Sequence, residues 1–294
     1  MSSRSNDNGR VLEAILTSVL SEKLKVPLSD AAQLSQVRDF EKIDSIPKPL
    51  KERFELQSDR LLLWFIDEGI IIPSKVLEIH RFSDFDAQQG NVADVQIQTE
   101  DGPTNISVKN NHTATKHQRP STVLVRLGVK KRSADNLGYL NEISEITDNF
   151  YEKAKMIMPS ATLFRELKSV DAEFINRECY APICALIDRY YTKFGSCPTC
   201  AENLLKFLVG SMDFYKVVFN EQGLCISNFK DIMVPSAFIS RHVEDRPGYL
   251  DLQFDNAWNF SLRLHTASSR LGNSLNLKFD TQLSNEPITP IYVS

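Results

Sequence analysis

Asp94 and Lys109 are the two residues of this 294-residue chain whose types and surroundings could perform chemistry together. A carboxylate binds Mg²⁺, an ion that keeps several water ligands and also accepts phosphate oxygens. A divalent ion held in this way polarises a phosphate and lowers the pKa of an attacking water. A neighbouring ammonium group orients that water or stabilises charge that develops on the phosphate oxygens. The pair therefore indicates hydrolysis of a phosphodiester bond.

A β-hairpin is predicted to bring these two side chains together. Residues 93–99 and 105–109 both alternate apolar and polar side chains, and a Gly-Pro turn separates them. Side chains two apart on a strand share a face, so Asp94, Ser107 and Lys109 are expected on the polar face. An acid and an amine on the exposed face of a hairpin are more often a solvated ion pair. The spacing alone therefore leaves both interpretations open.

The segment that contains and follows Lys109 is basic, although the chain as a whole carries a net negative charge. The protein has a net charge of −4, yet residues 106–133 contain no acidic side chain. The same segment contains seven basic residues: Lys109, Lys116, Arg119, Arg126, Lys130, Lys131 and Arg132. A basic stretch of this kind neutralises phosphates, which favours double-stranded DNA as a partner. The alternative is a solvated basic surface.

Four segments resemble the HaeIII-like type II restriction endonucleases. Gly90-Asn-Val-Ala-Asp-Val95 and Ile106-Ser-Val-Lys-Asn-Asn-His-Thr-Ala-Thr-Lys-His-Gln-Arg119 are similar to the central signature of that family. Trp258-Asn-Phe-Ser-Leu-Arg-Leu-His-Thr-Ala-Ser-Ser-Arg270 and Ser274-Leu-Asn-Leu-Lys-Phe-Asp280 are similar to its C-terminal motifs. The resemblance implies a PD-(D/E)XK nuclease core of mixed α/β class, in which a mixed sheet flanked by helices presents the catalytic hairpin. It also implies Mg²⁺-dependent cleavage of double-stranded DNA at a short palindrome, with GGCC as a candidate sequence.

Two departures from the family pattern affect the metal ligands. Ser107 stands where the superfamily has a carboxylate two residues before the lysine, and Asn91 stands where the family has an aspartate. One carboxylate holds a divalent ion poorly, so a second is expected from elsewhere. Glu13 on the first helix is the leading candidate and Asp84 the second, although Glu13 could equally be a solvated helix residue. The predicted catalytic residues are Asp94, Lys109, Glu13 and Ser107, with Asp94 and Glu13 as the Mg²⁺ ligands.

A further group of polar and basic residues is expected to contact DNA. The resemblance places there Asn111, His112, Lys116, His117, Arg119, Arg263, His265 and Arg270, beside Ser268, Ser269 and Lys278. Lysine and arginine contact phosphates, and arginine can also bind a guanine edge through two hydrogen bonds. Hydrogen bonding within the loop or a solvated strand is the alternative for each.

Four of the five cysteines form two closely spaced pairs. Cys179 with Cys184, and Cys197 with Cys200, would together complete a tetrahedral structural Zn²⁺ site. Buried reduced thiols are the simpler alternative, and Cys225 is expected in the core.

Helix-rich and strand-rich blocks alternate along the chain. Helical spacing predicts helices over residues 10–24, 28–40 and 49–68. Further helices are predicted within residues 141–210, including 182–194 and 199–209. The last of these begins with a capping-box pattern, formed by Thr199 and Glu202. Strands are predicted over residues 76–82, 93–99, 105–109, 122–129, 214–219, 250–254, 259–265 and 274–280. The expected organisation is a disordered tail (1–9), a catalytic core (10–135), a helical insertion or subdomain (136–210) and a strand-rich part completing the DNA cleft (211–294).

Composition narrows the class of protein. No apolar stretch approaches the roughly 20 residues of a membrane span, the polar start lacks the apolar core of a secretory signal, and five cysteines suit reduced thiols. A cytoplasmic enzyme is expected. Besides a restriction endonuclease, a repair or junction nuclease and a non-cleaving DNA-binding protein remain alternatives. A palindromic target favours a homodimer, and a restriction enzyme implies a matching DNA methyltransferase in the same host.

Overall fold

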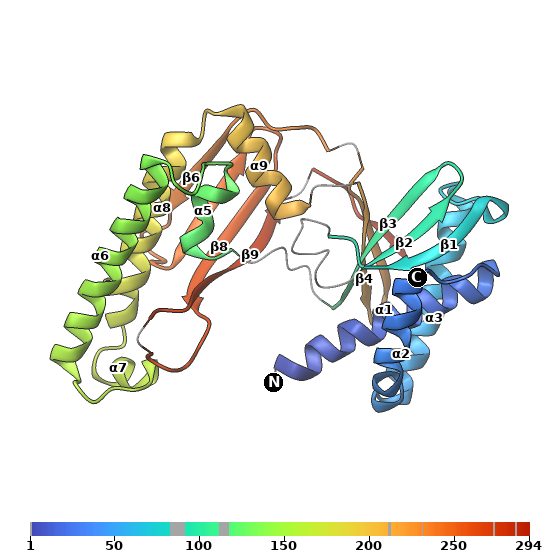
Figure 1. Ribbon diagram of the computed structural model, residues 1–294, viewed down its shortest axis with the longest axis horizontal. Coiled ribbons are helices and arrows are strands. Elements are labelled where there is room, and N and C mark those ends of the chain that lie inside the picture. The colour runs from blue at the N-terminus through green and yellow to red at the C-terminus, as the bar shows by residue number, and fades with distance from the viewer. Residues whose placement is uncertain are drawn as a thin grey trace. The chain divides into compact units, whose positions relative to one another are not determined.

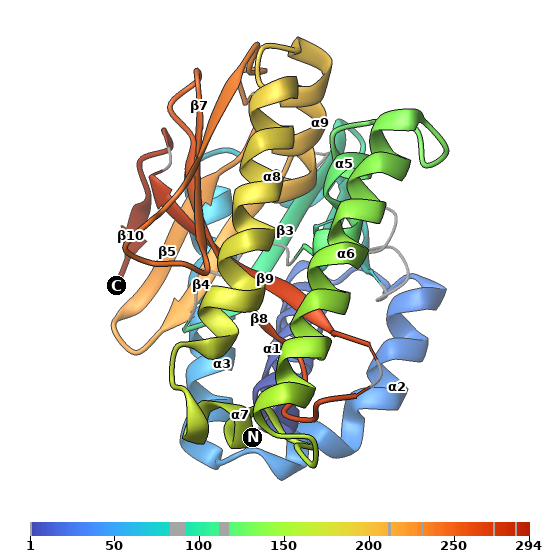
Figure 2. The same ribbon diagram turned by 90° about the vertical axis from the view of Figure 1, so that its left-hand side faces the viewer.

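The computed structural model describes residues 2–82, 92–111, 118–210, 213–230, 232–272, 274–285 and 287–294 (Figures 1 and 2). The chain forms two compact units, each built from separate stretches of sequence. The first unit contains Met1–Thr113, Gly210–Ile232 and Ile288–Ser294, and the second contains Ala114–Val209 and Met233–Pro287. This division differs from the predicted boundary near residue 135. The short helical segment after residue 119 packs within the second unit, so the chain leaves the first unit soon after the hairpin.

Three helices open the first unit, as the sequence predicts. They are α1 (Ser2–Leu24), α2 (Asp30–Ser45) and α3 (Lys48–Asp67). The first helix begins at Ser2 instead of Arg10, so residues expected to be a disordered tail continue the helix; extension costs little once a helix is nucleated. Ser29 caps α2 by accepting a hydrogen bond from the Ala32 N–H. Gly69, with φ of 67°, follows the end of α3.

A six-stranded mixed sheet completes the first unit. Its strands are β1 (Val76–Arg81), β2 (Val95–Thr99), β3 (Gly102–Asn110), β4 (Tyr215–Asn220), β5 (Gly223–Asn228) and β10 (Ile291–Val293). They lie in the order β1-β2-β3-β4-β5-β10, and a 3₁₀ turn over Pro73–Lys75 precedes β1. Only β3 and β4 are parallel among these neighbours. The predicted class, a mixed sheet flanked by helices, is confirmed, although β5 and β10 were not predicted.

One face of this sheet packs against α1 and α3. Val95, Ile97, Ile106 and Val108 lie in a core that also contains Leu12, Leu16, Leu61 and Phe65 from the helices. A slip of one residue in the hairpin would turn these apolar side chains to the opposite face. Burial therefore holds the register in which Val95 pairs with Ile106, and the same register keeps the polar face of the hairpin away from the core.

The second unit pairs helices with a four-stranded antiparallel sheet. Its helices are α5 (Val123–Arg126), α6 (Ala134–Ile157), α7 (Phe164–Val170), α8 (Ala181–Phe194) and α9 (Pro198–Val209). A short π-helical turn, Asn176–Tyr180, leads into α8. Its strands are β6 (Phe238–His242), β7 (Tyr249–Phe254), β8 (Asn259–Thr266) and β9 (Leu277–Asn285), in that order. Helices α6 and α8 lie side by side (Figure 2), and α8 packs on β6 and β7.

Two sequence predictions in this unit are wrong. The predicted strand over 122–129 is a 3₁₀ turn (Pro120–Thr122) followed by α5. Val123 and Leu124 are fully buried there, and a short continuous apolar run does not distinguish a strand from a buried helix. The expected capping box at Thr199 is also displaced, because α9 already begins at Pro198; proline suits the first turn since its missing N–H is not needed there.

No helix in the described part of the chain is long and apolar enough to cross a membrane.

Candidate active site

Asp94 stands directly before β2, where its backbone is bonded to both neighbouring strands. Its N–H donates to the carbonyl of Ile106 on β3 at 2.8 Å, and its carbonyl accepts from the Phe82 N–H after β1 at 3.0 Å. The side chain is therefore attached to a backbone fixed from both sides. Such support from regular elements suits a catalytic group better than a loop does.

Three donors from β3 converge on one oxygen of Asp94. Oδ2 accepts from the Val108 N–H at 2.7 Å, from Ser107 Oγ at 3.1 Å and from Lys109 Nζ at 3.2 Å. The side chains of Asp94 and Lys109 are 23% and 26% exposed, so both remain accessible. The structure thus brings together the acid, the amine and the serine that the hairpin pattern predicts on one face. Within the part of the chain that the structure describes, all three donors engage Oδ2 and not Oδ1.

Glu13 reaches the same place from α1. Arg81 Nη2 donates to Glu13 Oε2 at 2.9 Å, and the Glu13 side chain is 23% exposed. Loss of water around the carboxyl group, followed by repulsion from Asp94, raises the pKa of Glu13 from 4.5 to about 7, against the attraction of Arg81 and Lys109. Of the two candidates for the second acid, the structure places Glu13 beside Asp94; Asp84 lies outside the described residues.

Arg81 and Asp39 extend this cluster into the protein. The Arg81 side chain is 1% exposed, and its Nη2 lies 2.9 Å from Oδ2 of Asp39, which is fully buried. Burial acts to raise the pKa of Asp39, but the hydrogen bonds and charges of Arg38 and Arg81 outweigh it, so the pKa is lowered. Sequence reasoning missed both residues. The available signal was that Arg81 shares the buried face of β1 with Ile79, where a charged side chain requires a charged partner.

The ligand set at this position fits a divalent cation. Two carboxylates, from Asp94 and Glu13, lie close enough to repel each other, and each engages these protein donors through a single oxygen. Among the described residues no group of three or more His, Cys, Asp or Glu side chains could hold a metal ion. Mg²⁺ accepts a site with two carboxylates because it retains several waters and takes phosphate oxygens as further ligands.

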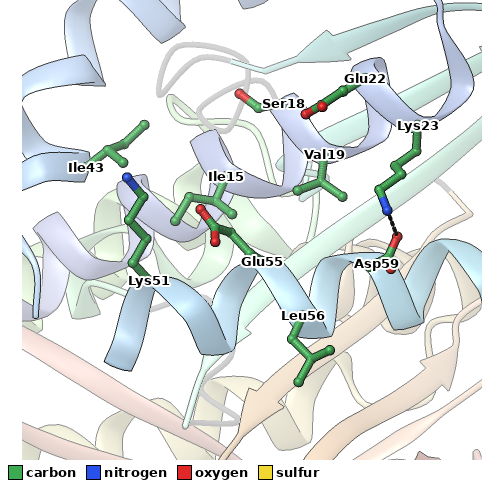
Figure 3. Close-up of a pocket in the computed structure, with 10 residues that line it drawn as sticks. All are labelled: Ile15, Ser18, Val19, Glu22, Lys23, Ile43, Lys51, Glu55, Leu56 and Asp59. Carbon is green, nitrogen blue, oxygen red and sulfur yellow. Dashed lines mark ion pairs between the residues drawn. The ribbon is translucent and has the colours of Figure 1, made fainter. Parts of the chain in front are cut away.

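A pocket on the other side of α1 is separate from this cluster. It has a volume of about 460 Å³, and Ile15 and Leu56 line it between α1 and α3 (Figure 3). The Lys23–Asp59 ion pair, 3.0 Å long, lies at its edge. Its lining residues on α1 are on the face of the helix opposite Glu13. The pocket therefore shares no residue with the candidate site.

The predicted DNA-contacting residues near the hairpin are only partly described. Asn111 follows β3 in a left-handed conformation, φ 57°, and its N–H donates to the Phe219 carbonyl at 3.0 Å. His112, Lys116 and His117 lie outside the described residues, as does Asn91.

The remaining predicted DNA-contacting residues belong to the second unit, and several have partners there. Arg119 donates to Asn276 Oδ1 at 2.8 Å, and the neighbouring Gln118 bridges to Phe279 on β9. The structure therefore joins the middle of the basic segment to the C-terminal motifs, which lie far away in the sequence. On the neighbouring strand, Arg263 pairs with Asp280 in the register of β8 and β9.

Three more of these residues make local contacts. His265 Nε2 lies 2.9 Å from Asp280. Arg270 bridges to Leu163, and its N–H donates to Ser268 Oγ at 3.0 Å. Lys278 Nζ lies 3.7 Å from Asp280. The contacts of His265 and Lys278 are made by their side chains, whereas those of Arg270 are made by its backbone. They are compatible either with a structural role or with a DNA-binding surface.

The structure does not support the predicted zinc site. Cys179, Cys184 and Cys200 are buried, Cys197 is partly exposed, and all are free thiols. Burial raises the pKa of Cys179 to about 12, as is typical of a thiol in the core. Since no three metal-binding side chains converge in the described ranges, the two pairs do not assemble into a tetrahedral set.

Comparison with known proteins agrees with the resemblance seen in the motifs. Residues 11–230 match the family model described as HaeIII restriction endonuclease. The type II restriction enzyme HaeIII of Haemophilus aegyptius is 26% identical over 332 aligned residues, which cover 99% of this chain and 98% of that enzyme. No solved structure matches the chain. The family match spans Glu13, Asp94 and Lys109, and the chain therefore belongs to the HaeIII restriction endonuclease family.

Proposed function

We propose that Asp94, Glu13 and Lys109 form the centre at which this type II restriction endonuclease hydrolyses phosphodiester bonds of double-stranded DNA. The observation that carries the proposal is the position of Lys109, 3.2 Å from Asp94, on a hairpin whose Val95 pairs with Arg81, the residue that holds Glu13 at 2.9 Å. Restriction endonucleases generally use divalent metals. We propose Mg²⁺ as the ion here, held by Asp94 and Glu13.

The bound ion would polarise the scissile phosphate and lower the pKa of the attacking water. Lys109 is placed to orient that water or to stabilise negative charge on the phosphate, because its ammonium group is anchored to Asp94 yet partly exposed. Ser107 does not replace the usual carboxylate of the PD-(D/E)XK pattern as a ligand. Instead its hydroxyl donates to Asp94 Oδ2, which keeps the carboxylate oriented, and Glu13 supplies the missing negative charge from α1.

The DNA-binding surface is proposed to include the basic segment and the C-terminal motifs. Support comes from the absence of acidic residues over 106–133 and from the contact of Arg119 with Asn276. Arg263, His265 and Arg270 of the second unit are proposed to contact DNA, and so are Asn111, His112, Lys116 and His117 of the segment that follows the hairpin. A short palindromic target such as GGCC, a homodimer that reads its two half-sites and a protective methyltransferase in the host complete the proposal.

Digestion of DNA of known sequence by the purified protein tests the site. Asp94→Ala and Lys109→Ala should each reduce cleavage with Mg²⁺ by roughly 10²–10³-fold or more, and a mobility shift in EDTA should show that DNA binding persists. The matched controls are Asp101→Ala and Lys75→Ala, which break another Asp–Lys pair, 2.9 Å long, beside the same hairpin. These controls should cut like the wild type. Undiminished cleavage by the Asp94 or Lys109 variant would show that the chemistry lies elsewhere, and end mapping would give the recognition sequence.

A further inference from the structure

Arg81 connects the proposed metal site to a buried acid that sequence patterns did not reveal. Its guanidinium comes from the end of β1, while its two carboxylate partners come from two different helices, Glu13 from α1 and Asp39 from α2. Both partners lie 2.9 Å from the same nitrogen, Nη2, which also donates to the Arg10 carbonyl at 3.1 Å. One nitrogen thus joins two helices to the edge of the sheet.

This arrangement is a poor solution if stability were its sole purpose. Within the described residues, Nε and Nη1 of Arg81 are buried and make no hydrogen bond, and an unsatisfied buried donor costs about 1–3 kcal/mol. Buried ion pairs are often no more stabilising than apolar side chains of similar volume. The placement of one nitrogen between two acids therefore favours a different purpose, namely orientation of Glu13.

We propose that Arg81 is a positioning residue for the metal site, fixing the Glu13 carboxylate beside Asp94 while Asp39 fixes Arg81. This inference rests on the proposed function, in which Glu13 binds the divalent ion. Among the described donors, Arg81 engages Oε2 of Glu13, so Oε1 is the oxygen that we assign to the ion. A glutamate side chain loses up to about 2 kcal/mol of rotamer entropy when it is ordered, and a side chain ordered in advance does not incur that cost when the metal binds.

Asp39 has a second effect on the site. Arg38 Nη2 lies 2.7 Å from Asp39 Oδ2 and Lys42 lies 3.5 Å from its Oδ1, so Asp39 is held from the solvent side as well. Because Asp39 shares the positive charge of Arg81, that charge does not fully neutralise Glu13. The carboxylate is thereby oriented by an arginine and still keeps negative charge for a cation.

The test measures Mn²⁺ binding by electron paramagnetic resonance and the Mg²⁺ concentration that gives half-maximal DNA cleavage, on the full-length protein. Arg81→Gln should weaken Mn²⁺ binding and raise the Mg²⁺ midpoint about 10- to 100-fold, the usual effect of losing a residue that orients a ligand. Arg81→Lys, which keeps the charge but cannot reproduce the planar guanidinium, should restore part of the loss. Lys23→Gln is the matched control, since it removes the cation of another ion pair of α1, with Asp59 at 3.0 Å, and should leave both midpoints within twofold.

If Arg81 served only to stabilise the fold, Arg81→Gln would lower the maximal rate of DNA cleavage in proportion to the fraction of folded protein. Both metal midpoints would then be unchanged, and that result would overturn the inference. The inference also fails if Lys23→Gln shifts the midpoints as much as Arg81→Gln. If circular dichroism shows that Arg81→Gln does not fold, Asp39→Asn provides the test instead. A several-fold rise in the Mg²⁺ concentration for half-maximal cleavage supports the inference, and an unchanged Mg²⁺ concentration refutes it. Glu13→Gln and Asp94→Ala identify failure of the proposed site itself, because in that case neither would weaken Mn²⁺ binding.

Discussion

Replacing Glu13 by glutamine should make the metal-free protein more stable at alkaline pH. The fold raises the pKa of Glu13 from 4.5 to about 7, so the folded state holds a proton that the unfolded chain has already released. An acid with a raised pKa therefore destabilises the fold as pH rises from 4.5 through 7, and the full cost is present above pH 7. At about 1.4 kcal/mol for each factor of ten in proton affinity, that cost is roughly 3 kcal/mol.

Glutamine resembles the protonated acid, since it is uncharged and its oxygen can still accept from Arg81. The pKa of about 7 for Glu13 already includes the attraction of Arg81, which lowers it. The loss of that attraction in the variant therefore adds no further cost to the free energy of unfolding. In EDTA, the variant should match the wild type near pH 4.5 and exceed it by up to about 3 kcal/mol at pH 8.5. For a chain of this size that difference corresponds to a rise in Tm of roughly 6–12 °C.

Calorimetric or denaturant unfolding at pH 5 and pH 8.5 measures this difference. Glu22→Gln on the same helix is the matched control, because that side chain is exposed, and it should show little change between the two pH values. A Glu13→Gln variant that is equally or less stable than the wild type at pH 8.5 would show that Glu13 is not held in an unfavourable ionised form. Cleavage should fall in the same variant, so stability and activity are expected to change in opposite directions.

Three further variants test the fold and the site. Ser107→Asp restores a carboxylate two residues before the lysine, but it replaces a side chain that is 4% exposed and bonded to Asp94. In EDTA, the free energy of unfolding of the Ser107→Asp variant should therefore be about 1–3 kcal/mol lower than that of the wild type, and Mg²⁺ should restore part of this loss. Equal Tm values of the variant with and without Mg²⁺ would contradict this prediction. Gly223→Ala should lower the free energy of unfolding by about 1–3 kcal/mol, because φ is +140° and a Cβ would clash with the carbonyl oxygen of Val293 on β10; an unchanged denaturation midpoint would refute it. A Cys197→Ser, Cys200→Ser double variant should bind no less zinc than the wild type by metal analysis, whereas loss of one bound zinc would restore the tetrahedral-site hypothesis.

Several features were predictable from the sequence because they depend on neighbours along the chain. The hairpin is an example: a period of two and a Gly-Pro turn suffice to place Asp94 and Lys109 on one face, and the structure brings them to 3.2 Å. The first three helices and most strands followed from periodicity in the same way. The family was recognisable because its central signature occupies both sides of the hairpin, in Gly90–Val95 and Ile106–Arg119.

Tertiary structure decided the features that depend on contacts distant in sequence. Glu13 lies near Asp94 only because α1 packs its apolar face on the sheet, and periodicity alone could not say which polar helix residue would reach the hairpin. Arg81 and Asp39 were missed since their pairing joins β1 to α2. Hydrophobic periodicity reports which face of an element is buried, whereas the partner that covers that face is selected by packing and charge compensation across the whole unit.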